Sequence, residues 1–206
     1  MTPRQRIFDI AHGNIWDVEQ NFHESFAQGL LEIWFPNIRL LDGCDQGNRI
    51  HLEGDALLHT GLVFAHAAFE KNLTESNRFV LLVAAAVHDI CKPQTRRIRE
   101  DKVTFYGHAE MAAPLCPSFA KNVGMDAIEA ERLEWVVLRH MQAHDLPKFG
   151  AVKRLRFYQT SHFPVLAALQ AADARGVWKN QDGSLHMEVL ADFFAQDYEK
   201  LSAAVI

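Results

Sequence analysis

Hydrophobic and polar positions follow one another along most of this chain with the period of an α-helix. Between Asn14 and Phe35 the apolar side chains recur every three or four positions, which places them on one face of a helix. Pro36 ends this segment, and a loop rich in Gly, Asn and Asp follows at Asp42–Gly47. The pattern therefore predicts one amphipathic helix over Asn14–Phe35.

The same periodicity predicts several further helices. Arg78–Ile90 is apolar almost all round, so we expect it to be buried on every side, with Asn77 as its cap. The other predicted helices are Asp55–Phe69, a short helix from His108 that kinks or restarts at Pro114, Asp126–His140 or slightly beyond, a segment from Pro164 to about Val177, and Leu185–Leu201.

The helical period breaks between Thr95 and Tyr106, where basic residues precede the short run Val-Thr-Phe-Tyr. This segment is predicted to form a small β-hairpin. No repeat of 20–50 residues is visible, which argues against a solenoid. The predicted fold class is therefore all-α, a helical bundle with a small β-hairpin near 95–106.

Composition narrows the class of protein. The chain has 206 residues, 49% of them hydrophobic, which suits one globular domain. Its net charge of −5 argues against a protein built mainly to bind nucleic acid. The longest apolar run, Phe79–Val87, is far shorter than the roughly 20 residues that span a bilayer, and the first residues lack a signal peptide's apolar run. We expect a cytoplasmic protein with no membrane partner.

Histidine is abundant and cysteine is scarce. There are 11 histidines and three cysteines, and the cysteines (Cys44, Cys91 and Cys116) form no Cys-x-x-Cys motif. This spacing excludes a disulfide scaffold and a zinc ribbon. Any metal in this protein must therefore be held by imidazole and carboxylate groups.

One His-Asp pair stands out by its position. His88 and Asp89 end the apolar helix, whereas a second pair, His144-Asp145, shows that the dipeptide alone is a weak signal. Buried polar groups need hydrogen-bond partners or a metal. The pair is therefore either a metal ligand set or a hydrogen-bonded core histidine with a capping aspartate.

Two other helices carry similar side chains. His59 lies within Asp55–Phe69, and Asp173 follows the apolar run Val165–Ala172. A lone carboxylate on such a face is costly unless it is paired. Helical bundles commonly build metal sites from inward-pointing side chains of several helices, and this arrangement predicts such a site.

Five short motifs then occur in order along the chain. They are Phe35-Pro36-Asn37, Ile50–Asp55 with His59-Thr60, His88–Pro93, Thr104–His108 and Ala172–Gly176. With these motifs the chain resembles the HD-domain metal phosphohydrolase superfamily, and more narrowly the C-terminal HD domain of bacterial CCA-adding tRNA nucleotidyltransferases. Leu52 and Cys91 depart from the usual residues, Pro and Gly.

The resemblance covers about residues 34–178 and implies one HD domain over 1–206. Residues 1–33 would form an N-terminal helical extension, and 179–206 a C-terminal helix. The nucleotidyltransferase half of those enzymes has no counterpart in these residues, so we do not expect nucleotide addition to tRNA.

The resemblance also implies a ligand set. The residues that match the superfamily's metal ligands are His59, His88, Asp89 and Asp173. Many members hold a second metal with two further histidines, for which His108 and then His140 or His144 are the candidates. Imidazole with carboxylate suits one or two divalent transition ions (Fe, Mn, Ni, Co or Zn), and Mg is also possible.

Residues outside the ligand set are expected to act on the substrate. Lys92, three positions after Asp89, is placed to stabilise negative charge on a phosphate, so these two are the catalytic candidates. Arg96, Arg97 and Arg99 either bind phosphate or form a solvated hairpin face. The candidate substrate contacts are Lys92, Arg96, Arg97, His144 and Arg175.

Three positions could have another role than the one their motif suggests, or a role near the site that the ligand set does not include. Arg175 would point about 200° away from Asp173 on a straight helix, so it could instead serve the structure. His51 lies in a matching motif and could touch the site, and Glu110 could orient His108.

The resemblance implies a metal-dependent phosphohydrolase that uses a metal-activated water on a phosphomonoester or phosphodiester. The expected substrate is a small phosphorylated molecule such as a nucleotide, or an RNA end. Two alternatives remain open, a dinuclear-iron oxygenase of the HD type and a non-catalytic HD module that binds RNA or another ligand. The acidic net charge and the complete ligand set weigh against the second.

Overall fold

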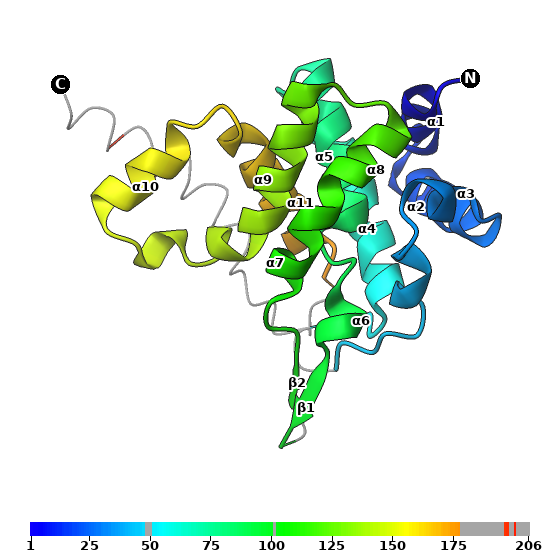
Figure 1. The fold of residues 1–206 in the computed structure, drawn as a ribbon, viewed down its shortest axis with the longest axis horizontal. Coiled ribbons are helices and arrows are strands. Elements are labelled where there is room, and N and C mark those ends of the chain that lie inside the picture. Colours follow the sequence, from blue (N-terminus) through cyan, green and yellow to red (C-terminus); the bar gives the residue numbers. More distant parts are fainter. Residues whose placement is uncertain (48–50, 101, 178–195, 198–199, 201–206) are drawn as a thin grey trace.

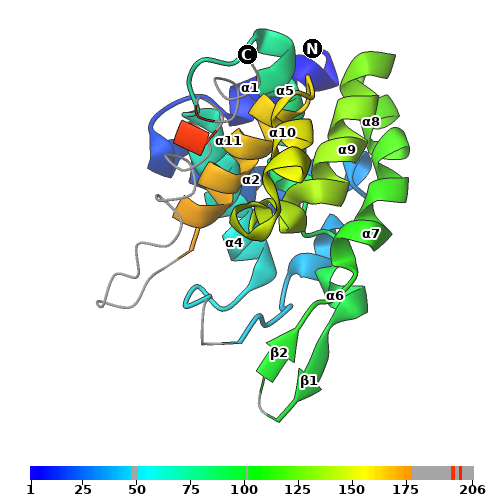
Figure 2. The same ribbon diagram turned by 90° about the vertical axis from the view of Figure 1, so that its left-hand side faces the viewer.

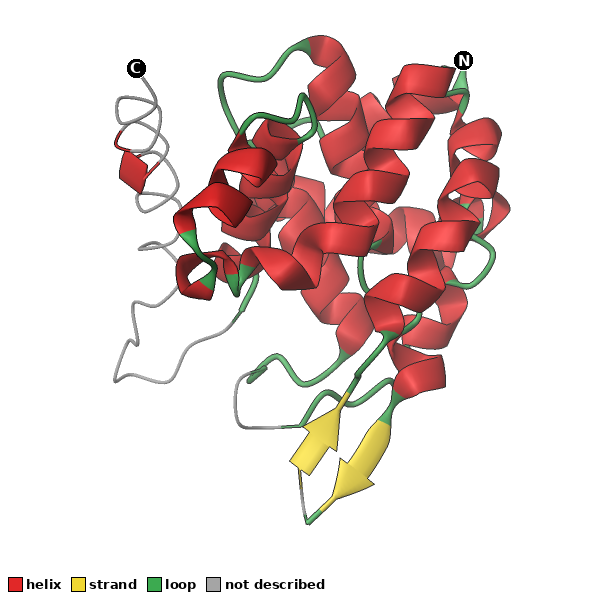
Figure 3. Ribbon diagram, turned by 60° about the vertical axis from the view of Figure 1, so that its left-hand side comes forward, coloured by secondary structure: helices red, strands yellow, loops and turns green. Residues whose placement is uncertain are grey.

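The computed structural model describes residues 1–47, 51–100, 102–177, 196–197 and 200, and helices make up most of it (Figure 3). The first helices are α1 (Pro3–Ile10), α2 (Ile15–Ala27), α3 (Leu30–Trp34), the 3-10 turn η1 (Ile38–Leu41), α4 (Ala56–Ala68), α5 (Glu75–Val87) and α6 (Lys92–Thr95). After the hairpin come α7 (His108–Ala112), η2 (Ala113–Leu115), α8 (Cys116–Val123), α9 (Ala127–Ala143), η3 (Leu146–Lys148), α10 (Ala151–Tyr158) and α11 (Phe163–Arg175). The all-α prediction is confirmed (Figure 1).

The prediction of one helix over Asn14–Phe35 is wrong. The segment forms two helices, α2 and α3, which are separated at Gly29. Gly29 has φ 72°, a left-handed conformation that glycine adopts at little cost and that interrupts an α-helix. The hydrophobic period continues across the break because both helices bury apolar side chains in the same core.

The helix α5 lies at the centre of the bundle. It begins at Glu75, and the Thr74 hydroxyl accepts from the Asn77 backbone amide, so Thr74 and not Asn77 is the cap. Every residue of Phe79–Val87 is buried, as its all-round apolar pattern predicts. The helices α4, α9 and α11 pack against it.

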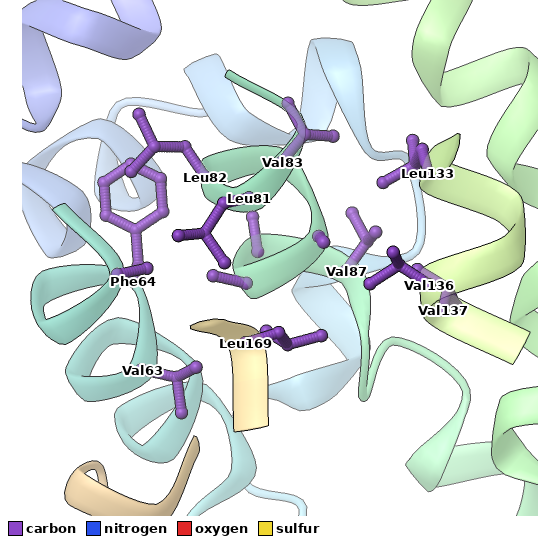
Figure 4. Packing of buried hydrophobic residues seen from close by; sticks show 14 of the residues in the cluster. Val63, Phe64, Leu81, Leu82, Val83, Val87, Leu133, Val136, Val137 and Leu169 are labelled. Carbon is purple, nitrogen blue, oxygen red and sulfur yellow. The ribbon is translucent and has the colours of Figure 1, made fainter. Parts of the chain in front are cut away.

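Figure 4 shows how this core is filled. Leu81 of α5 lies between Phe64 of α4 and Leu169 of α11, while Val87 faces Val136 of α9. All of these side chains are at most 3% exposed. The dense core holds the ends of α4, α5, α9 and α11 at one place, and the polar side chains of the bundle meet there.

The predicted hairpin is present as β1 (Arg97–Arg99) and β2 (Lys102–Thr104), an antiparallel pair. Ile98 lies opposite Val103 in the register. The hairpin projects away from the helices at the lower end of the molecule in both Figure 1 and Figure 2.

The segment after the hairpin also follows its prediction, with a short α7 and a 3-10 turn at Pro114 before α8. The next helix, α9, ends at Ala143, slightly beyond His140 as predicted. The sequence pattern missed α1 and α10, two helices of eight residues. The predicted helix Leu185–Leu201 lies mostly outside the described residues.

Within the described part of the chain, no helix is both long and apolar enough to cross a membrane.

Candidate metal centre

Five helices bring imidazole and carboxylate groups together at one end of the core. His59 lies in α4, His88 is the C-terminal cap of α5 and Asp89 follows it, His108 begins α7, His140 lies near the end of α9, and Asp173 lies near the end of α11. The first five are at most 4% exposed, and the Asp173 side chain is 15% exposed. The tertiary fold therefore gathers six of the seven ligand candidates named from the sequence, and the seventh, His144, lies at the edge of the group.

The first group joins His59 and His88 to the two aspartates. His59 Nε2 lies 3.0 Å from Asp173 Oδ1 and 3.7 Å from Asp89 Oδ2. His88 Nε2 lies 3.2 Å from Asp89 Oδ2 and 3.9 Å from Asp173 Oδ1. Both rings thus direct the same nitrogen at the same pair of carboxylates.

The second group lies on the other side of Asp89. His108 Nε2 is 3.2 Å from Asp89 Oδ1, and His140 Nε2 is 3.9 Å from the same oxygen. The two Nε2 atoms are 3.0 Å apart. Asp89 therefore presents one oxygen to each group, as a carboxylate that bridges two ions would.

The ring orientations are set by the backbone. The Nδ1 atoms of His88, His108 and His140 lie 3.0, 2.7 and 2.7 Å from a backbone carbonyl three residues earlier. A carbonyl only accepts, so each Nδ1 carries the hydrogen and each neutral ring keeps its lone pair on Nε2. The three lone pairs point into the centre.

These donors fit a divalent transition metal. Two imidazole lone pairs 3.0 Å apart, on His108 and His140, repel one another unless a cation or a proton lies between them. Within the described part of the chain, the buried His88 Nε2 has no hydrogen-bond partner. Imidazole nitrogens with carboxylate oxygens are ligands that Fe, Mn, Co, Ni and Zn accept. Asp89 with His108 and His140, and His59 with His88 and Asp89, are two of the three groups among the described residues that could each hold an ion.

The surroundings of Asp89 and His140 determine their protonation states. Burial opposes ionisation of the Asp89 carboxyl, but the neighbouring His88 ring, the ammonium of Lys92 and a hydrogen bond with His108 hold its pKa well below the usual range. Burial and the neighbouring His88 and His108 lower the pKa of His140 to about 3. An ionised aspartate and a neutral histidine are the protonation states in which these residues bind metal.

Lys92 is part of the same cluster. Its ammonium lies 2.6 Å from Asp89 Oδ2 and donates to Gln46 Oε1 at 2.5 Å, and only 6% of the residue is exposed. The ring of Phe105 lies 5.4 Å from this ammonium. Lys92 is therefore held as a buried cation beside the carboxylate that joins the two groups.

His144 lies at the exposed edge of the centre. Its side chain is 29% exposed, its Nε2 is 3.6 Å from Asp173 Oδ2, and it contacts the side-chain amide of Gln170. His140 is the buried member of the pair and His144 the accessible one, although they are only one helical turn apart.

Other predicted residues are engaged elsewhere. The Arg96 guanidinium binds the backbone carbonyl and carboxylate of Asp45, and Arg97 donates to the Arg96 carbonyl. The guanidinium of Arg175 pairs with Glu70, away from the cluster. Glu110 is exposed, and the His108 Nδ1 that it was expected to orient is bound to a backbone carbonyl instead.

Two residues in the cluster were not singled out from the sequence. Glu53 forms a hydrogen bond with His51 and lies 3.1 Å from His59 Nδ1, and Gln46 accepts from Lys92. The available signal for Glu53 was its place in the motif Ile50–Asp55, two residues after His51. Gln46 lies in a polar loop, and its sequence context carries no such signal.

The fold and the site together define a helical-bundle protein with a buried His-Asp centre that can hold divalent metal. The family model of the HD domain matches residues 57–175, more than half of the chain, and the chain belongs to the HD-domain family. It is also similar to the CC-adding tRNA nucleotidyltransferase of Thermus thermophilus, with 31% identity over 160 residues. That alignment covers 72% of this chain and 34% of the relative, so the chain spans about a third of the relative's length. The resemblance inferred from the sequence is confirmed.

Proposed function

We propose that this chain is a metal-dependent phosphohydrolase that cleaves a phosphate ester of a nucleotide or of an RNA end. The observation that carries the proposal is the meeting of four imidazoles and two carboxylates from five helices around Asp89. Most members of the HD-domain family are metal-dependent hydrolases, and the match over 57–175 supports the same class here.

The ligands would fall into the two groups already described. The first ion would be held by His59, His88, Asp89 and Asp173. The second would be held by His108 and His140 together with Asp89. When bound, a divalent ion supplies a Lewis acid for a phosphate oxygen and lowers the pKa of a bound water from 15.7 toward about 7.

The protein's own residues then provide charge and orientation. The ammonium of Lys92 would stabilise the negative charge that builds on phosphorus oxygens during attack, because it is buried beside Asp89. Gln46 holds this ammonium in place. His144 is accessible next to Asp173, so it would contact the bound ester.

The hairpin supports a substrate with more than one phosphate. Arg97 and Arg99 alternate along β1, and Lys102 lies opposite Arg99, so these three cations share one face of the hairpin. Val103 lies on the other face and faces Gly47 of the loop. In this proposal Arg96 positions the hairpin through Asp45, while Arg97 and its neighbours attract the anionic substrate.

The test compares the two His-Asp pairs of the chain. Wild type, Asp89→Ala and Asp145→Ala are purified without chelator, analysed for bound metal, and assayed on phosphomonoesters, phosphodiesters and cyclic nucleotides. Asp145 is 52% exposed and pairs only with Lys148 among the described residues, so it is the matched control. We expect Asp89→Ala to lose bound metal and more than 100-fold in turnover, and Asp145→Ala to retain both.

The same experiment separates the alternatives. A wild type that turns over no phosphoester with any added divalent ion would refute the hydrolase. Bound iron together with consumption of oxygen would instead indicate the oxygenase. Tightly bound metal without any turnover would indicate a non-catalytic module, and its affinity for RNA should then fall steeply with salt.

A further inference from the structure

His59 is oriented differently from the other three histidines of the centre. Each of those rings points its Nδ1 at the backbone carbonyl three residues earlier on the chain. The corresponding carbonyl for His59 belongs to Ala56, and it already accepts from the Thr60 hydroxyl at 2.7 Å. Another group must therefore hold the His59 ring.

The carboxylate of Glu53 lies beside the Nδ1 atom of this ring. Glu53 Oε1 lies 3.1 Å from His59 Nδ1 and 2.7 Å from His51 Nδ1. The Glu53 side chain is fully buried, whereas that of His51 is 20% exposed. Two ring nitrogens thus converge on one buried oxygen, and only the His59 ring continues into the metal centre.

The backbone holds Glu53 in this place. Gly54 adopts φ 77°, and its carbonyl accepts from the Gln46 backbone amide at 2.7 Å. Asp55 then caps α4 by accepting from the amides of Leu57 and Leu58. The carboxylate is therefore fixed relative to the helix that carries His59.

We propose that Glu53 is a positioning residue for the metal centre, which fixes the orientation and tautomer of His59 and strengthens its binding to metal. The inference rests on the proposed metal site. With the carboxylate accepting the Nδ1 hydrogen, the lone pair of the neutral ring would stay on Nε2, which faces Asp173 and Asp89. A carboxylate is also a stronger acceptor than a carbonyl and makes the ring a better electron donor.

A different role would make Glu53 a ligand. The ligand atoms of His51, Glu53 and His59 lie within 4.8 Å of one another and could hold an ion of their own. A neutral imidazole has one lone pair, so His59 cannot serve that ion through Nδ1 and also bind the central ion through Nε2. The geometry favours the positioning role, and the stoichiometry of bound metal distinguishes the two.

The experiment measures metal binding directly. Wild type, Glu53→Ala, Glu53→Gln and Glu110→Ala are stripped of metal and titrated with Co²⁺, with affinity followed by calorimetry and coordination by visible absorption. Glu110 is a matched control because it is exposed and lies two residues from His108. Circular dichroism checks that each variant folds, and Glu53→Gln, which keeps an oxygen acceptor, is the variant to use if Glu53→Ala does not.

We expect Glu53→Ala to weaken Co²⁺ binding about 10–100-fold and to change the Co²⁺ spectrum, at unchanged stoichiometry. Glu53→Gln should lose less, and Glu110→Ala should match wild type. Wild-type affinity in both Glu53 variants, or the loss of one whole ion, would overturn the proposal. A wild type that binds Co²⁺ but hydrolyses no ester would refute the hydrolase and leave this inference standing.

Discussion

Asp89 joins the two halves of the centre because its two oxygens face different groups. Oδ2 lies near His88 and His59, and Oδ1 lies near His108 and His140. Lys92 is bound to the same carboxylate. Any substitution of Asp89 therefore disturbs both groups and the nearest cation together, whereas the histidines can be tested one group at a time.

At the scale of single residues, His140 and His144 provide the clearest test of which histidine belongs to the second group of ligands. His140 Nε2 is buried 3.0 Å from His108 Nε2, whereas His144 is accessible beside Asp173. We expect His140→Ala to reduce the bound metal by one ion in metal analysis of loaded protein. His144→Ala should keep the full stoichiometry but lower turnover on phosphoesters.

His12 is exposed and serves as the control for this pair, so His12→Ala should match wild type in both measurements. Equal metal content in His140→Ala and wild type would contradict the assignment of the second group.

At the scale of elements, the centre depends on how closely α11 approaches α4. Gly176 follows the end of α11, and a Cβ there would lie 2.8 Å from Val63 Cγ2 and 3.1 Å from the Val63 backbone nitrogen. A backbone atom cannot move aside as a side-chain tip can. The absence of a side chain at this position therefore sets the separation between the helices that carry His59 and Asp173.

We expect Gly176→Ala to destabilise the protein by about 1–3 kcal/mol in urea unfolding, because the added methyl group overpacks the contact with α4. Metal affinity should fall too, since Asp173 lies three residues before the displaced position. A Cβ added at Gly150 would meet open space, and the φ of Gly150 is −62°, so Gly150→Ala should cost less than about 1 kcal/mol. Equal stability losses in the two variants would argue against a close approach at Gly176.

At the scale of the whole molecule, the proposed metal binding would be coupled to folding. The ligands come from segments as far apart as α4 and α11, and they meet only in the folded chain. An ion that binds the folded state alone stabilises it by about 2.7 kcal/mol at 100 times its dissociation constant.

For a domain of this size we therefore expect excess Mn²⁺ to raise the Tm of metal-free wild type by roughly 5–10 °C in a thermal scan. Asp89→Ala should show almost no shift, and Asp145→Ala should show the full one. A shift of equal size in Asp89→Ala would place the bound ion outside this centre.

The sequence alone determined much of this protein. The 3–4 spacing of apolar residues predicted most of the helices, because amphipathic helices bury one face. The His88-Asp89 pair at the end of a fully apolar helix, with His59 and Asp173 on other buried helices, was enough to indicate a metal site. Periodicity could not find the break at Gly29, because both sides of the break face the same core.

Only the tertiary structure decided which polar groups meet. The buried place of His140 and the accessible one of His144 depend on how α9 crosses the other helices, which a helical period does not specify. Arg175 pairs with Glu70 and Arg96 pairs with Asp45, because packing decides which side chains of distant segments come into contact. The place of Glu53 beside His59 was decided in the same way: no local pattern shows that the Ala56 carbonyl accepts from Thr60 or that a buried carboxylate lies beside the ring.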